Sequence, residues 1–153
     1  MEGLGRFLLT HSQLDLHTQL ARFRRRELLR IFLSDIRRLA TIAEITEDIS
    51  NLADAILETA LRSAEQEMDN RFGKPQTLDE KGRSTVAEFC IVSLGKLGSR
   101  ELNYASDIDL LFLYSDDGHT SGTGTPSDWW SANRSIFRPG RVPTIPNRSE
   151  QRR

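Results

Sequence analysis

Residues 95–110 read GKLGSRELNYASDIDL, and this stretch decides which fold the sequence predicts. It follows a compact, mostly apolar run at 88–94 and leads into a second one at 108–114. Both runs have the length and the β-forming composition of strands, and the turn at 95–99 contains two glycines. The stretch is therefore predicted to join two strands through a tight turn and a short polar segment.

Asp107 and Asp109 are the candidate catalytic and metal-binding residues. Because successive side chains of a strand point to opposite faces, the two carboxylates are expected on one face, with Cα atoms ~7 Å apart. Ile108 and Leu110 are then expected to point into a core. Two neighbouring carboxylates repel each other unless a cation lies between them, which favours Mg²⁺. A metal held there would neutralise the charge that develops in phosphoryl or nucleotidyl transfer.

The candidate nucleotide-binding residues are Lys96, Gly98, Ser99 and Ser106. Gly98 would let the backbone approach a phosphate, and Ser99 would add a hydroxyl donor. If residues 100–103 begin a short helix, its N-terminus would face the same anion. An isolated Asp-x-Asp pair is most often a solvated surface pair. Its combination with a strand, a Gly-Ser turn and a short spacer is instead typical of polymerase-β-like nucleotidyltransferases.

Residues 13–72 are predicted to form two long helices packed against each other, because apolar residues recur there at three- and four-residue steps. Thr41 and Glu44 have the spacing of a capping box, so the second helix is expected to begin near Ile42. Gly73 is expected to end it.

The other segments complete an α+β prediction: a long helical hairpin, an incomplete polymerase-β-like sheet and a disordered tail. Residues 73–87 are predicted to be a polar linker and residues 88–118 a partial nucleotidyltransferase core. Residues 119–153 are predicted to be unstructured, because they are rich in Gly, Pro, Ser, Thr and Arg and show no period. Two strands alone make a marginal sheet, so we expect its apolar faces to be poorly covered.

Composition argues against several classes of function. The 153 residues fit one domain, and a net charge of -1 gives no general attraction to nucleic acid or to a membrane surface. The arginines at 22–26 alternate with apolar residues at helical spacing, so a solvated or ion-paired helix face is predicted there. The single cysteine, Cys90, lies in an apolar run and is predicted to be buried. No membrane span or signal peptide is predicted, and the cytoplasm is the expected location.

Residues 94–112 closely resemble the signature of the glutamine synthetase adenylyltransferases, also called glutamate–ammonia-ligase adenylyltransferases. Residues 23–31, FRRRELLRI, and 51–55, NLADA, resemble helices of the same family. The resemblance implies a large cytoplasmic enzyme with two nucleotidyltransferase halves. One half transfers AMP from ATP to a tyrosine of glutamine synthetase. The other removes it with phosphate and releases ADP, and a PII signalling protein and glutamine set the balance.

The resemblance also implies roles for individual residues. Asp107 and Asp109 match the family's metal carboxylates, and Gly98 and Ser99 match its phosphate-side turn, where Ser99 replaces a usual second glycine. Residues 103–109 are more similar to the adenylyl-removing half. The family's third carboxylate lies in a later Arg-x-Asp-x-Arg-x-Arg-Pro-like motif, which is absent from this sequence. The acids that follow the signature strand are Asp116, Asp117, Asp128 and Glu150.

We therefore expect a truncated fragment that is inactive, or nearly so, alone. Two other functions remain open. The chain is alternatively a non-catalytic module whose helical pair binds glutamine synthetase or a PII protein. A third reading is a compact nucleotidyltransferase acting on another molecule, which would require a third carboxylate from the tail, such as Asp128.

Overall fold

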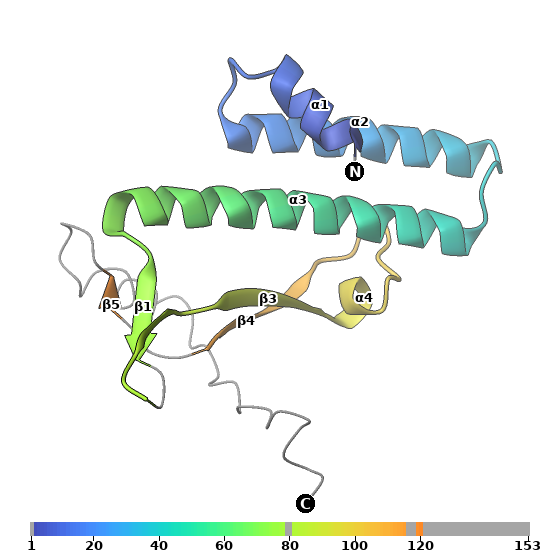
Figure 1. Cartoon of the computed structure of the whole chain (residues 1–153). Helices are drawn as coiled ribbons and strands as arrows, with labels where there is room; N and C mark the ends of the chain where they lie inside the picture. The colour runs from blue at the N-terminus through green and yellow to red at the C-terminus, as the bar shows by residue number, and fades with distance from the viewer. Residues whose placement is uncertain (1, 79–80, 116–118, 121–153) are drawn as a thin grey trace, which may run out of the picture. The chain divides into compact units, whose positions relative to one another are not determined.

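The computed structural model describes residues 2–78, 81–115 and 119–120. Its elements follow in the order α1 (Glu2–Thr10), α2 (Leu16–Ile36), α3 (Ile42–Phe72), β1 (Pro75–Leu78), β2 (Ser84–Val86), β3 (Phe89–Leu94), α4 (Gly95–Gly98), β4 (Asp109–Tyr114) and β5 (His119–Thr120) (Figure 1). Long helices combined with small sheets confirm the α+β class. The chain divides into two compact units, which are described in turn: residues 1–66 with 93–109, and residues 67–92 with the described residues from 110 onward.

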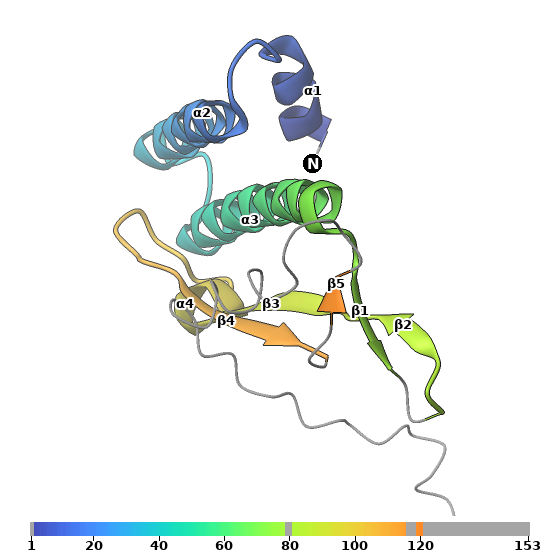
Figure 2. The same ribbon diagram turned by 90° about the vertical axis from the view of Figure 1, so that its left-hand side faces the viewer.

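The predicted helical pair is present in the first unit. α2 and α3 lie side by side in both ribbon views (Figures 1 and 2). Ile31 of α2 is fully buried, and Ile45 and Ile49 of α3 are each only 5% exposed. Burying one such side chain stabilises the fold by about 1.5–3 kcal/mol. At the rim of the pair, Arg30 of α2 forms an ion pair with Asp48 of α3 at 3.3 Å.

Local signals set the ends of both helices. The Asp15 carboxylate accepts a hydrogen bond from the Thr18 backbone N–H at 2.9 Å, so α2 begins at Leu16, slightly later than the predicted boundary. α3 ends before Gly73, whose φ of 78° places it in the left-handed region, as expected of a glycine that terminates a helix.

The predicted capping box at the start of α3 is formed in full. The backbone N–H and the hydroxyl of Thr41 donate to the Glu44 carboxylate at 2.7 and 2.9 Å, and the Glu44 N–H donates to the Thr41 hydroxyl at 3.3 Å. The helix therefore begins at Ile42, as predicted. The backbone N–H of Thr41, together with its hydroxyl, lowers the pKa of Glu44 below the usual 4.5.

This lowered pKa predicts a pH-dependent contribution of Glu44 to stability. Because the folded-state pKa lies below the unfolded one, the contribution is complete above about pH 4.5 and is lost as the pH falls through the folded value. Glu44→Gln keeps the cap geometry without the charge, so its difference in melting temperature from the wild type should shrink on acidification. Thermal unfolding followed by circular dichroism from pH 3 to pH 7 would measure this. Glu47→Gln controls for the loss of one charge, and an equal effect there would contradict the assignment.

α1 is an element that the sequence pattern did not predict. It packs on α2 through Phe7, whose ring lies 5.5 Å from the ring of Phe23, and the Arg26 guanidinium covers both rings at 4.7 and 5.0 Å. A helix of this length has little stability of its own, so tertiary packing must hold it. Arg26 also pairs with Glu27 at 2.8 Å, which agrees with the predicted ion-paired face of α2.

In the second unit, the segment 73–87, which was predicted to be a polar linker, contains the two short strands β1 and β2. β1 pairs antiparallel with β2, and β1 also pairs antiparallel with β5. Both strands are short and carry few apolar residues, which is why no strand period was visible. Pro75 stands at the first position of β1, where its missing N–H costs the ladder least.

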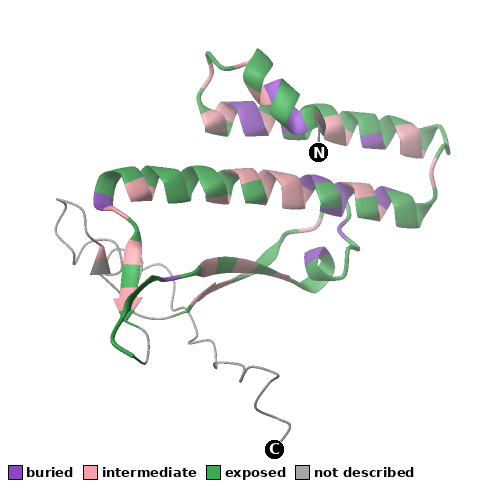
Figure 3. Ribbon diagram, in the orientation of Figure 1, coloured by how far each residue is buried: buried purple, intermediate pink, exposed green. Residues whose placement is uncertain are grey.

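The predicted strands at 88–94 and 108–114 are confirmed as β3 and β4, each starting one residue later. The Ser115 N–H donates to the Glu88 carbonyl at 2.9 Å, so the end of β4 lies beside the start of β3 and the pair is antiparallel. Partly buried and exposed residues alternate along β3 (Figure 3). Cys90 is on the exposed side, so its predicted burial is wrong, because only alternate residues of this strand are covered.

Two predictions fall partly or wholly on residues outside the described ranges. They are the end of the nucleotidyltransferase core at 116–118 and the tail, of which only His119 and Thr120 are described. Within the described ranges, no helix combines the length and the apolar character that crossing a bilayer requires.

Candidate functional site

The candidate site residues lie along one hairpin that runs from the end of β3 through α4 and a loop to β4. α4 begins directly after β3, so the segment predicted to be a turn is a single turn of helix. No helix follows at 100–103, which corrects that conditional prediction. The left-handed backbone of Arg100, with a φ of 61°, stops the helical path before that segment.

Asp109 and Gly95 are brought together at the base of this hairpin. Gly95 has a φ of 54°, and a Cβ built on it would lie 2.7 Å from Oδ2 of Asp109. The carboxylate therefore lies directly against the backbone at the start of α4, in space that only a glycine leaves open. This contact joins the end of β3 to the start of β4.

Asp107 is placed differently from the prediction. β4 begins at Asp109, so Asp107 lies before the strand and does not alternate with Asp109 in a ladder. The reason is a local turn: the Ser106 N–H donates to the Asn103 carbonyl at 3.2 Å, and the Ala105 N–H donates to Oδ1 of Asn103 at 3.0 Å. Both carboxylates are exposed, and Ile108 is 41% exposed rather than directed into a core.

The two candidate serines already make hydrogen bonds within the chain. The Ser99 hydroxyl lies 3.2 Å from the Gly95 carbonyl and 3.4 Å from that of Lys96, where it closes the end of α4. The Ser106 hydroxyl donates to Oδ1 of Asn103 at 2.8 Å and accepts from its N–H at 3.2 Å. A phosphate would have to compete with these bonds, so both serines shape the loop in this structure.

Gly98 and Lys96 both lie on α4, but Gly98 packs closely against the end of β3, whereas Lys96 is exposed. A Cβ at Gly98 would lie 2.5 Å from the Ser93 carbonyl oxygen, so glycine is required there by the close packing of α4 on the end of β3. From the sequence alone, a different reason was predicted for this glycine, namely that it lets the backbone approach a phosphate. Lys96 is exposed, and its ammonium group is available to an anion.

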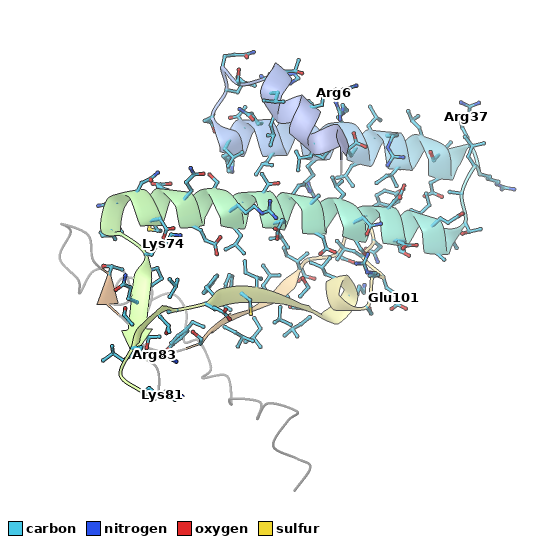
Figure 4. All side chains as sticks on the ribbon, in the orientation of Figure 1. Arg6, Arg37, Lys74, Lys81, Arg83 and Glu101 are labelled. Carbon is cyan, nitrogen blue, oxygen red and sulfur yellow. The ribbon has the colours of Figure 1, made fainter. Side chains whose placement is uncertain are left out.

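The loop between α4 and β4 is anchored to α3 by residues that sequence reasoning did not identify. The Arg100 guanidinium donates to Oδ1 of Asn51 at 2.6 Å and lies 3.8 Å from the Asp54 carboxylate. The buried Ser50 hydroxyl accepts from the Leu102 N–H at 3.2 Å. Figure 4 shows the loop and labels Glu101, which lies between these two anchors in the sequence.

A second anchor joins the same loop to α2. The Tyr104 hydroxyl lies 3.3 Å from the Asp35 carboxylate, and its ring packs perpendicular to the ring of Phe32 with 5.8 Å between the centroids. Partial burial and the neighbouring Asp35 raise the pKa of Tyr104 above its usual value. The hydrogen bonds of these anchors join residues that are 49 to 69 positions apart in the sequence, which no local pattern connects.

The carboxylate oxygens of the candidate residues fit a magnesium ion that is held jointly by the protein and by the phosphate oxygens of a substrate. Mg²⁺ prefers oxygen ligands and commonly uses one or two carboxylates plus phosphate oxygens. Asp107 and Asp109 supply such a pair. In the described part of the chain, no cluster of three or more His, Cys, Asp or Glu side chains could hold a metal without substrate. The later acids, Asp116, Asp117, Asp128 and Glu150, lie outside that part.

A shallow cleft lies beside the loop but does not contain the carboxylates. Its volume is about 490 Å³, and it is lined by the first turns of α3 together with Arg100 and Glu101. Asp107 and Asp109 are both exposed among the described residues.

Comparisons with known proteins identify relatives of the chain. The family model described as glutamate-ammonia ligase adenylyltransferase matches residues 5–136. The bifunctional glutamine synthetase adenylyltransferase/adenylyl-removing enzyme of Nitrosomonas europaea is 39% identical over 113 residues, which is 72% of this chain and 12% of the relative. The enzyme of the same name from Pseudomonas aeruginosa is 40% identical over 110 residues, 71% of this chain and 11% of the relative. The chain thus spans about an eighth of the length of these relatives.

Proposed function

Because the chain belongs to the glutamate–ammonia ligase adenylyltransferase family, we propose that residues 95–109 form the metal and nucleotide end of a nucleotidyltransferase site acting on glutamine synthetase. The observation that carries the proposal is the Asp109 carboxylate lying against Gly95. It places an acidic group beside the turn that bears Lys96. The polymerase-β-like fold is proposed on the same order of strand, turn and Asp-x-Asp motif.

The proposed mechanism is positioning with charge neutralisation. Bound Mg²⁺ would offset the charge that develops on the phosphate oxygens during transfer. Asp107 and Asp109 would hold the ion, with Asp109 kept in place by its contact with the start of α4. Lys96, exposed on α4, would attract the phosphate end of the nucleotide. The exposure of both carboxylates suits a tyrosine presented by a folded protein.

We further propose the adenylyl-removing direction, from the similarity of residues 103–109 to that half of the family. A phosphate oxygen would form a bond to the AMP phosphorus while the bond to the tyrosine oxygen breaks. The products are ADP and the free tyrosine hydroxyl. A PII protein as a second partner and a cytoplasmic location belong to the same proposal.

The test is phosphate-dependent ADP release from adenylylated glutamine synthetase. Because the described residues supply two carboxylates and no third, we expect a rate close to background, since removing one charged ligand raises such a barrier by several kcal/mol. Saturable, Mg²⁺-dependent binding of ADP should remain. A release rate like that of a full-length relative would overturn the two-carboxylate argument, whereas absence of nucleotide binding would overturn the site itself.

A second candidate, a non-catalytic module, is favoured by the lack of a three-acid cluster among the described residues. In that case the chain would bind glutamine synthetase or a PII protein without chemistry. Co-sedimentation with glutamine synthetase separates the two candidates. Binding that is unchanged when Asp107 and Asp109 are replaced by Asn, with no nucleotide binding in the wild type, would support the module.

A further inference from the structure

The loop that carries the carboxylates is held by the middle of α3 and not by the hairpin alone. Ser50 is fully buried, and its hydroxyl donates to the Thr46 carbonyl at 2.8 Å while it accepts from the Leu102 N–H at 3.2 Å. Leu102 is itself 5% exposed. A buried N–H without a partner is strongly unfavourable, so the Ser50 hydroxyl fixes where the loop passes α3.

Arg100 adds a directional constraint to the same segment. Its φ of 61° is unusual for a residue with a side chain, and such a conformation persists only where the surroundings hold it. Its guanidinium reaches Asn51 at 2.6 Å and Asp54 at 3.8 Å, which lie one turn apart on α3. The side chain thus holds the backbone where α4 ends and the loop begins.

These anchors are close in sequence to the metal-binding candidates. Between Leu102 and Asp107 lies only the Asn103–Ser106 turn, whose hydrogen bonds are internal. Tyr104 connects this turn to Asp35 of α2 at 3.3 Å. The anchors, the turn and both carboxylates belong to one compact unit of the chain. A displacement of the Arg100 backbone would therefore displace the Asn103–Ser106 turn and, with it, the carboxylates that follow.

We propose that Arg100, held by Asn51 of α3, is a positioning residue for the Asp107–Asp109 pair. The inference rests on the proposed function, because it assigns Arg100 a role in the same metal site. It makes the helical pair a part of the site rather than a separate docking element. Metal affinity should therefore depend on side chains of α3 that touch neither the metal nor the nucleotide.

The experiment measures Mn²⁺ binding to the whole chain by electron paramagnetic resonance in the presence of ADP. Asn51→Ala and Arg100→Gly should each weaken Mn²⁺ binding by about tenfold, the lower end of the range found when supports of metal ligands are removed. Glycine accepts the positive φ, so Arg100→Gly removes the side chain without forcing a new backbone path. Asn51→Asp keeps an oxygen acceptor for Arg100 and should restore most of the affinity.

A double-mutant cycle and a matched control complete the test. If Asn51 acts through Arg100, adding Asn51→Ala to Arg100→Gly should cause no further loss. Glu58→Ala breaks the exposed Glu58–Arg62 pair farther along the same helix and should leave Mn²⁺ affinity unchanged. Wild-type Mn²⁺ binding that does not depend on Asp109 would overturn the proposed function, and this inference with it. Binding that depends on Asp109 but is unchanged by Asn51→Ala and Arg100→Gly would overturn only the positioning role.

Discussion

Asp109→Asn is expected to weaken Mn²⁺ or Mg²⁺ binding by about 100-fold, and the double change with Asp107→Asn should abolish saturable binding. An amide keeps the shape of the carboxylate but removes the charge that a hard divalent cation requires. The effect should be larger for Asp109, because its carboxylate is fixed against Gly95, whereas Asp107 lies outside the strand. Isothermal titration with Mg²⁺ and ADP would measure both affinities.

The control for this experiment is Glu65→Gln, which removes one exposed carboxylate from α3 at a distance in sequence from the hairpin. Its Mg²⁺ affinity should equal that of the wild type. If Glu65→Gln and Asp109→Asn weaken binding equally, the ion is attracted by overall charge alone. The assignment of the metal site to Asp107 and Asp109 would then be wrong.

Gly95→Ala is expected to reduce metal affinity by at least tenfold at a modest cost in stability. A Cβ at this position would lie 2.7 Å from Oδ2 of Asp109, and the carboxylate is the group that can move. The left-handed backbone adds a strain of about 1–2 kcal/mol for a residue with a side chain. The substitution therefore displaces a ligand and slightly destabilises the fold. Urea unfolding and Mn²⁺ titration would measure the two effects separately.

Gly82→Ala is the matched control for this substitution. Gly82 also has a positive φ, 74°, but a Cβ there meets nothing within 4 Å. Both variants should lose similar stability from backbone strain, and only Gly95→Ala should lose metal affinity. Equal Mn²⁺ affinity in the two variants would show that the contact between Gly95 and Asp109 does not position the carboxylate.

Periodic and capping signals predicted the regular elements well. The apolar period and the Thr41–Glu44 box gave the start of α3 correctly, because a capping box is closed by residues three positions apart. The strand runs predicted β3 and β4 to within one residue of their starts. α1, β1, β2 and β5 were missed, since each is short and depends on a partner rather than on its own pattern. β5 lies at 119–120, so these two residues contradict the prediction of an unstructured tail.

The sequence by itself determined the α+β class, the helical pair and the two strands of the hairpin that carries the candidate site, because these depend on neighbouring residues. Only the tertiary structure decided which groups surround the Asp-x-Asp motif. It placed the Asp109 carboxylate against Gly95, gave Gly98 a packing role against Ser93, and tied Arg100 to Asn51. The contacts of Asp109 with Gly95 and of Arg100 with Asn51 join residues that are distant in the sequence. Their geometry follows from how the hairpin folds and how its loop packs on α3, which no local period encodes.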